Sequence, residues 1–301
     1  MENVRSNRSF DIENFGLTCT IEPIWPGVVL KQPKDWEPIR ETVDLCFSAE
    51  PLIFEKLGQH PRIVRYLGLR GRGLLLGQAS HGNLQTYIDT TPSISLRQRV
   101  LWCRQLTEAV CHIHSRGVVH SDLRPQNVLV HESTPGSRDL LVCDFGGSAC
   151  EELGLNGGNL PDGPFYHPVF DGVSSSALDI FSLGSLFYTV LTGCWPYRST
   201  PGRPEILKEA IAYEEEIAEA LNQGKYPDLK GIVGGTVILA CWTRQYGTAE
   251  EVLRALEREM PVPEVEAELE EANHSFVLLG TAMSIAAAAA LTYILMQRQV
   301  R

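Results

Sequence analysis

Three side chains that could do chemistry stand close together in the stretch HSDLRPQNVLV, which begins at His120. They are the carboxylate of Asp122, the guanidinium of Arg124 and the carboxamide of Asn127. A carboxylate can accept the proton of an attacking hydroxyl, and a carboxamide oxygen is a ligand that magnesium accepts. A planar guanidinium can bind two phosphate oxygens at once. The stretch therefore contains the groups that phosphoryl transfer needs.

Three further residues complete such a site in chain order. Lys31 ends the apolar run VVLK, Glu50 follows in a segment with helical spacing, and Asp144 comes directly after the apolar run LLVC. Phosphoryl transfer depends on positioning and electrostatics, because its transition state spreads charge over the transferred group. We expect Lys31 to hold the α- and β-phosphates of ATP, and Asp144 and Asn127 to hold Mg²⁺. Each residue alone says little, but their order and spacing together favour an ATP-dependent transferase.

The composition limits the class of protein. With 301 residues, of which 44% are hydrophobic, the chain can form one large domain or two small ones with a sizeable core. Its formal net charge of -11 argues against broad nucleic-acid binding, which needs Lys and Arg to neutralise phosphate. The 8 cysteines form no CxxC pair, which fits free thiols in a reducing compartment. The N-terminal stretch MENVRSNRSFDIENFG has no apolar run, so we expect no secretory signal.

The patterning predicts an α+β chain in two lobes. A strand is expected in WPGVVLKQP, a helix in DLCFSAEPLIFEKLG, and two more strands on either side of the Gly-Arg-Gly turn at 71–73. A long amphipathic helix is predicted from Ser95 to Gly117, where Gly117 can end it. Short strands follow in VVH, NVLV and LLVCDF, and from Ser176 the pattern is mostly helical.

From roughly residue 10 to 258, the sequence resembles the eukaryotic protein-kinase domain. HSDLRPQN matches the catalytic-loop pattern H-x-D-L-x-x-x-N, DFG is intact, and Pro125 is similar to the loop of Ser/Thr-type members. The resemblance implies a small antiparallel-sheet N-lobe at 1–77 and a mostly helical C-lobe at 78–260. It implies transfer of the ATP γ-phosphate to Ser or Thr hydroxyls of a protein substrate. Within the family, the chain looks most like small fungal kinases.

The resemblance also implies residues that bind the nucleotide. Leu76 stands where the family has its gatekeeper, adenine would lie against the backbone of Gly77 and Ala79, and Leu129 would line the same slot. Asp179, in the motif DIFSLG, would anchor the catalytic loop. Four side chains fall where the family stacks its regulatory spine: Phe54, Tyr66, His120 and Phe145.

Two departures from the family pattern affect the nucleotide site. The glycine-rich loop is reduced, with only Gly16 and Gly27 in the stretch GLTCTIEPIWPG before Lys31. Pro51 directly follows Glu50, and proline disfavours helical geometry in the residue before it. We therefore expect Glu50 at a helix start rather than inside a helix, which puts its ion pair with Lys31 in question.

Other departures concern regulation. Ser121 replaces the catalytic-loop Arg that grips a phosphate on the activation loop of the family, and this loop offers only Ser148 and Tyr166 as obvious sites. Activation by loop phosphorylation is therefore not expected. The family's Ala-Pro-Glu is reduced to the triplet at 167–169, and Tyr246 replaces the Arg that pairs with that Glu. Losing both partners together leaves no unpaired buried charge.

Two alternatives to an active protein kinase stay open. The first is a pseudokinase that acts as a membrane-anchored protein-binding module, which the reduced glycine loop and Pro51 favour. The second is a small-molecule kinase on the same scaffold, such as one acting on choline or aminoglycosides. The intact DFG, Pro125 and the helix with Asp179 favour a protein kinase.

The C-terminal region predicts a membrane anchor. The stretch SFVLLGTAMSIAAAAALTYILM at 275–296 has no charged residue and is long enough to span a bilayer as a helix, after an acidic linker at 261–274. The alternative is a buried helix of the core. We expect a tail anchor with the kinase domain facing the cytosol, in the mitochondrial outer membrane or the endoplasmic reticulum. Arg298 and Arg301 oppose that orientation by the positive-inside rule.

A small-residue pattern in this stretch offers a route to self-association. Gly280, Ser284 and Ala288 lie four residues apart, so one helix face would allow two helices to approach closely. Coincidence in an Ala-rich segment is the alternative explanation.

Overall fold

The computed structural model describes residues 19–262, apart from positions 36, 92, 157, 203, 205 and 206. The chain divides into two compact units, Met1–Met260 and Pro261–Arg301, and all the helices and strands described below belong to the first. No helix among the described residues is long and apolar enough to cross a membrane. The predicted span 275–296 lies outside the described residues, as does the predicted linker from residue 263 onward.

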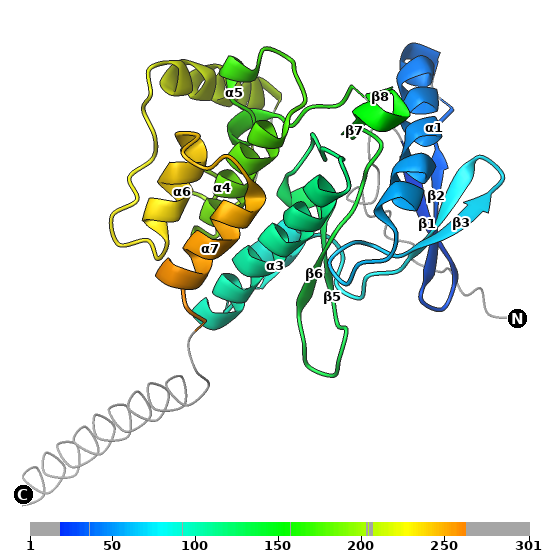
Figure 1. Ribbon diagram of the computed structural model, residues 1–301, viewed down its shortest axis with the longest axis horizontal. Helices are drawn as coiled ribbons and strands as arrows, with labels where there is room; N and C mark the ends of the chain where they lie inside the picture. The colour runs from blue at the N-terminus through cyan, green and yellow to red at the C-terminus, as the bar shows by residue number, and fades with distance from the viewer. Residues whose placement is uncertain are drawn as a thin grey trace, which may run out of the picture. The chain divides into compact units, whose positions relative to one another are not determined.

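A twisted sheet and one helix form the N-lobe, coloured blue to cyan in Figure 1. The strands are β1 (Cys19–Trp25), β2 (Val28–Pro33), β3 (Tyr66–Arg70) and β4 (Gly73–Gly77), paired antiparallel in the order β1-β2-β4-β3. The helix α1 (Arg40–Leu57) contacts β2 and β3. The predicted α+β fold with a sheet in the N-lobe is thus present.

Helix α1 runs straight through Pro51, so the expectation that Glu50 begins a helix is wrong. Proline inside a helix removes one backbone hydrogen bond and disfavours the helical form of the preceding residue. Here the buried face of α1 outweighs that local cost, because fully packed side chains lie on both sides of the proline. These buried residues are Val43, Cys46, Ala49, Ile53, Phe54 and Leu57.

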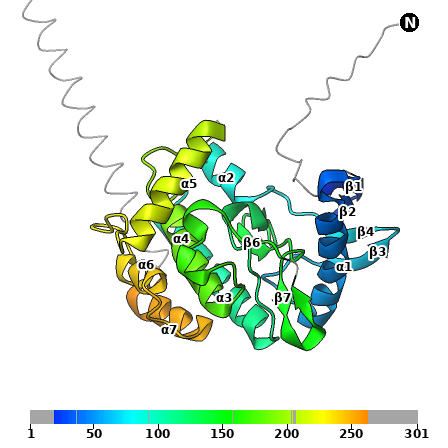
Figure 2. The ribbon, with the colours of Figure 1, turned by 90° about the horizontal axis from the view of Figure 1, so that it is seen from above.

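Helices form most of the C-lobe, which Figure 2 shows with α3, α4 and α7 close together. Helix α4 is the most deeply buried, and α3 contacts both α4 and α7. A side chain at Gly184 would come within 2.8 Å of Cys241, so this glycine allows α4 and α6 to pack closely. The helices are α2 (Leu84–Thr90), α3 (Leu96–Ser115), α4 (Ser176–Thr192), α5 (Leu207–Asn222), α6 (Gly235–Trp242) and α7 (Ala249–Glu259).

The end of α3 matches the prediction. Gly117 has φ 71° and donates to His114 O, while Val118 donates to Ile113 O, which is the Schellman arrangement. At the other end, the Ser95 side chain accepts from Gln98 N. This helix brings the chain to the start of the catalytic loop.

Two short hairpins complete the C-lobe and flank the candidate site. Strands β5 (Val128–His131) and β6 (Asp139–Val142) pair antiparallel, as do β7 (Ala149–Cys150) and β8 (Leu155–Asn156). The predicted strand VVH is wrong, because within the described residues it forms a single bridge, between Val119 and Ala149. Short 3-10 turns cover residues 37–39, 125–127, 151–153, 163–165 and 168–170.

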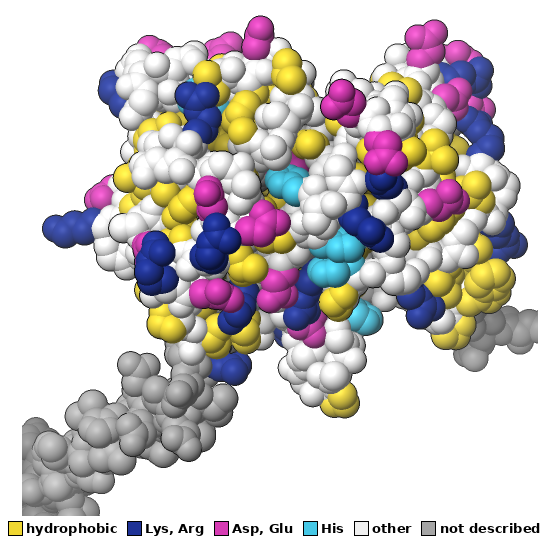
Figure 3. All heavy atoms as spheres, viewed as in Figure 1, with side chains coloured by type: hydrophobic (Ala, Val, Ile, Leu, Met, Phe, Trp, Pro, Cys, Tyr) yellow, Lys and Arg dark blue, Asp and Glu magenta, His cyan; other side chains and the backbone are white. Residues whose placement is uncertain are grey.

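The visible surface mixes charges of both signs. On the face in Figure 3, the basic side chains of the described residues are interspersed with acidic ones and do not gather in one patch. This distribution fits the net charge of -11 and gives nucleic acid no continuous basic surface on that face.

Candidate active site

One lysine joins the N-lobe to the candidate site. Lys31 Nζ, on β2, donates to Glu50 Oε2 of α1 at 2.7 Å and to Asp144 Oδ1 at 2.7 Å. The side chains of Lys31 and Glu50 are 6% and 1% exposed, whereas that of Asp144 is 42% exposed. The ion pair that the sequence left in question is therefore formed and buried. Asp144 keeps an open side that faces away from the pair.

The three charges shift each other's titration. Burial alone would lower the pKa of Lys31, but Asp144 and Glu50 outweigh it and raise that pKa well above its usual value. Burial raises the pKa of Glu50, and Lys31 offsets this only in part. Burial would also raise the pKa of Asp144, but Lys31 outweighs it and lowers that pKa. Lys31 and Asp144 are thus held in their charged forms.

The catalytic loop places its carboxylate and carboxamide in contact. Asn127 Nδ2 donates to the backbone oxygen and to Oδ2 of Asp122, both at 2.8 Å. The amide oxygen of Asn127 consequently points away from Asp122. Arg124 Nε lies 3.3 Å from Asp122 Oδ1, yet Oδ1 accepts no hydrogen bond within the described part of the chain. An unbonded acceptor on a carboxylate that is 6% exposed is what a bound hydroxyl could satisfy.

The pKa of the Asp122 carboxyl is raised in the folded chain. Burial raises its pKa to about 7, helped by the neighbouring charge of Asp144 and opposed by Arg124. A base works best when its pKa lies near the working pH. The loop thus supplies a carboxyl whose pKa burial raises towards neutral pH.

A buried aspartate fixes the loop. Asp179, on α4 and 0% exposed, accepts from His120 N at 2.8 Å and from Ser121 N at 2.9 Å. Ser121 has φ 72°, a conformation that side chains other than Gly disfavour, and these bonds help to hold it. The predicted anchoring of the loop by Asp179 is confirmed.

A stack of rings links the two lobes behind the site. Phe54 lies 5.1 Å from Tyr66 and 5.1 Å from Phe145, and Phe145 lies 5.0 Å from His120, measured between ring centroids. The predicted spine is therefore continuous from β3 through α1 to the catalytic loop. Because all four rings pack together, the positions of α1 and of the DFG segment are coupled.

The residues expected to bind adenine lie on β4, in the segment directly after it, and on β5. Leu76 is buried and pairs opposite Val29, two residues before Lys31 on β2. Among the described residues, no group accepts the backbone N–H of Ala79, which leaves this donor available to a ligand. Leu129 lies on β5, half-buried, in a bridge with Asn83. Gly77 N is already bonded to Arg65 O at 2.8 Å, so only its carbonyl could face adenine.

Sequence reasoning missed one charged residue at this site. Asp162 Oδ1 accepts from Arg124 Nη1 at 3.2 Å, so the guanidinium lies between two carboxylates. No motif marks Asp162, and it is 38 residues from Arg124 along the chain. Only the fold brings the two together.

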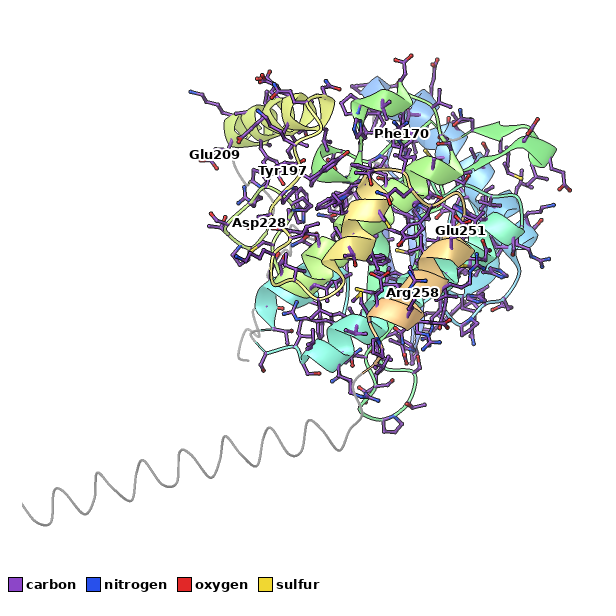
Figure 4. All side chains as sticks on the ribbon, turned by 60° about the vertical axis from the view of Figure 1, so that its left-hand side comes forward. Phe170, Tyr197, Glu209, Asp228, Glu251 and Arg258 are labelled. Carbon is purple, nitrogen blue, oxygen red and sulfur yellow. The ribbon has the colours of Figure 1, made fainter. Side chains whose placement is uncertain are left out.

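The segment after DFG is bonded in place without phosphate. Ser148 is 0% exposed and its Oγ donates to His120 O at 3.0 Å, while the hydroxyl of Tyr166 accepts from Gly172 N at 2.8 Å. In place of the missing ion pair, the rings of His167, Phe170 and Phe181 pack edge to face. Phe170 is labelled in Figure 4. Both potential phosphorylation sites thus already serve as structural contacts.

Known proteins resemble this chain in sequence. The family model for the protein kinase domain matches residues 37–233. Ribosomal protein S6 kinase alpha-2 from Homo sapiens is 30% identical over 197 residues, covering 60% of this chain and 24% of that protein. Sperm motility kinase Z from Mus musculus is 28% identical over 243 residues, covering 74% of this chain and 43% of that protein. The chain spans less than half of the length of either relative. Both relatives are vertebrate proteins, so the similarity to small fungal kinases finds no support in them.

Proposed function

The chain belongs to the protein kinase domain family, and from that premise we propose that it transfers the γ-phosphate of ATP to Ser or Thr hydroxyls of a protein. The observation that carries the proposal is the buried contact of Lys31 with Glu50 and Asp144. Lys31 cannot meet both carboxylates unless α1 and the DFG segment are in place, which is the arrangement phosphoryl transfer requires. The two relatives, both named as kinases, and the Ser/Thr-type Pro125 support the choice of substrate hydroxyl.

The residues present fit Mg²⁺ and ATP. Asp144 offers a partly exposed carboxylate, and the amide oxygen of Asn127 is turned away from Asp122. Oxygen donors of these two kinds are the ones that Mg²⁺ prefers, and together they would hold the ion. When bound, Mg²⁺ supplies positive charge that neutralises the phosphates. Lys31 would hold the α- and β-phosphates, with its ammonium already fixed by Glu50.

The remaining chemistry belongs to the catalytic loop. Asp122 Oδ1 would accept the hydroxyl proton of the substrate as the oxygen attacks the γ-phosphorus. The bond between the γ-phosphorus and the bridging oxygen breaks in the same step, and ADP leaves. Arg124, with its fork between two carboxylates, would present its remaining N–H groups to the phosphoryl oxygens. Asp179 and His120 keep the loop rigid while this occurs.

The pseudokinase alternative loses one of its two supports. Pro51 was expected to displace Glu50, but α1 continues through it and the ion pair with Lys31 is closed. Its other support, the reduced glycine loop, lies mostly within the described residues: Gly16 falls outside them, whereas Cys19–Trp25 forms β1 and Gly27 has φ 75° in the turn before β2. This support therefore remains.

Nucleotide binding and transfer test the proposal together. Full-length protein is heated with ATP, with and without Mg²⁺, and then incubated with γ-labelled ATP and generic basic and acidic proteins. We expect Mg²⁺-dependent stabilisation of about 2.7 kcal/mol at 100 times the dissociation constant, and label on Ser or Thr. The variant Asp144→Asn, which removes a metal ligand, should lose both effects. Stabilisation without transfer would make the protein a nucleotide-binding pseudokinase.

We further propose that residues 275–296 tether the protein to a membrane, with the kinase domain in the cytosol. The uncharged stretch supports the tether, and the 8 cysteines, all free thiols, support a reducing compartment. The outer mitochondrial membrane and the endoplasmic reticulum are the candidate sites. Carbonate extraction should leave the full chain in the pellet and release a variant lacking 275–296, and added protease should digest the kinase domain in intact organelles. Release of the full chain would contradict the tether.

We also propose that two copies of the chain associate through the helix face formed by Gly280, Ser284 and Ala288. The variant Gly280→Ile would block close approach of two helices. It should abolish cross-linking between differently tagged copies in membranes, whereas unchanged cross-linking would rule this face out.

A further inference from the structure

The guanidinium of Arg124 lies close to two carboxylates, those of Asp122 and Asp162. Its Nη1 lies 3.2 Å from Asp162 Oδ1 and donates to it, while its Nε lies 3.3 Å from Asp122 Oδ1 without a hydrogen bond. Within the described part of the chain, no side chain bonds to Nη2. The guanidinium of Arg124 is therefore fixed by a hydrogen bond at Nη1, and its Nη2 donors stay available beside Asp122.

Both ends of this contact are anchored to one buried helix. Asp162 leads into the short turn at 163–165, whose carbonyls accept from α4: Ser185 Oγ donates to Pro164 O at 2.5 Å, and Ser182 Oγ donates to Phe165 O at 2.7 Å. Asp179, also on α4, holds the catalytic loop. The distance between Asp162 and the loop is thus set by the core of the C-lobe and needs no phosphate.

Stability alone does not explain the pair. The side chains of Arg124 and Asp162 are 31% and 53% exposed, and ion pairs this open to water contribute little to folding. The hydrogen bond to Asp162 instead fixes the orientation of the Arg124 guanidinium. Without Asp162, Arg124 would have a single carboxylate partner, Asp122, and would close onto the Oδ1 that the substrate hydroxyl needs.

We propose that Asp162 is a positioning residue, which holds Arg124 towards the transferred phosphoryl group and keeps its guanidinium from forming a hydrogen bond to Asp122 Oδ1. The inference rests on the proposed function and deepens it. Asp162 itself touches no reacting atom in this account. It acts through Arg124, so its effect should appear in the chemical step and should depend on Arg124 being present.

A double-mutant cycle on the full-length chain tests this inference. The variants are Asp162→Asn, Arg124→Ala and the two combined, with Asp171→Asn as a matched control. Asp171 is exposed on the same segment and has φ 49°, which Asn tolerates. The measurements are kcat and KM for ATP, with the midpoint of thermal unfolding to establish that each variant folds.

We expect Asp162→Asn to lower kcat about 10-fold, less than the loss of a direct donor to the transition state would cost. KM for ATP should stay within about twofold, and Asp171→Asn should match the wild type. In the Arg124→Ala background, Asp162→Asn should change kcat by less than about twofold. An unchanged kcat, or an equal loss in both backgrounds, overturns the inference while the proposed function stands. A wild-type chain with no transfer above Asp122→Asn overturns the proposed function itself.

Discussion

Replacing Lys31 by methionine should lower the stability of the fold, because Glu50 and Asp144 then lose their shared cation. The ammonium of Lys31 is the only cation that the described structure places in contact with both Glu50 and Asp144, and it is 6% exposed. Methionine has a similar length but no charge, so the packing is largely kept while two carboxylates lose their partner. Removing one member of a buried ion pair costs about 3–5 kcal/mol.

The loss of stability in Lys31→Met should become smaller as the pH falls. Without Lys31, the pKa of the buried Glu50 carboxyl rises further above its unfolded value, because burial already raises it and Lys31 opposes that shift. The folded variant then binds more protons than the unfolded chain, so its stability increases as the pH falls. The difference in the free energy of unfolding between the wild type and Lys31→Met is therefore largest near pH 8 and smaller near pH 5.5.

Thermal and urea unfolding at both pH values measure this effect. A loss of about 4 kcal/mol corresponds to a melting temperature lower by about 8–16 °C, at about 2–4 °C per kcal/mol for a domain of this size. The control is Lys225→Met, at an exposed lysine, which should change stability by less than about 0.5 kcal/mol. A Lys31→Met loss no larger than the control's, or one that does not shrink at low pH, would refute the reasoning.

Three other predictions follow from the catalytic loop and the segment after it. Because burial raises the pKa of Asp122 to about 7 and the base must be ionised, kcat/KM should fall about tenfold per pH unit below that value; a flat profile from pH 5 to 8 would exclude this residue as the base. Asp179→Asn turns an NH₂ donor towards one of the two backbone N–H groups, that of His120 or that of Ser121, and should cost about 3 kcal/mol in urea unfolding; a neutral result would contradict its anchoring role. Phosphatase treatment should change activity by less than about twofold, because Ser148 is buried and bonded; a larger drop would reveal a phosphorylated site that the account omits.

Local signals in the sequence predicted the elements whose causes are local. The strand after Gly27 and the two strands on either side of the Gly-Arg-Gly turn were predicted from these turns, and Gly117 ended its helix as expected. Strand β1 was missed because its sequence CTIEPIW contains a proline and a glutamate and lies at the edge of the described sheet, where pairing with β2 defines it. The stretch VVH has strand-forming residues but meets only one partner residue, Ala149.

The candidate catalytic residues could be proposed from their order and spacing in the sequence, but the contacts between them could not. The proline after Glu50 predicted that Glu50 stands at the start of a helix, and the tertiary packing of α1 overrode that local preference. The pairing of Arg124 with Asp162 has no signal in the sequence, since it depends on where α4 holds the segment at 163–165. Order along the chain thus predicted the chemistry, and only the fold revealed what orients it.

Transfer of the ATP γ-phosphate by the full-length chain, compared between wild type and Asp122→Asn, tests the central claim most directly. Asparagine keeps the size of the side chain and removes its ability to take a proton. With Mg²⁺ and a generic protein substrate, we expect label on Ser or Thr in the wild type and a rate lower by at least about 100-fold in the variant. Equal background in both proteins would contradict it, and the assembled site would then serve only to bind.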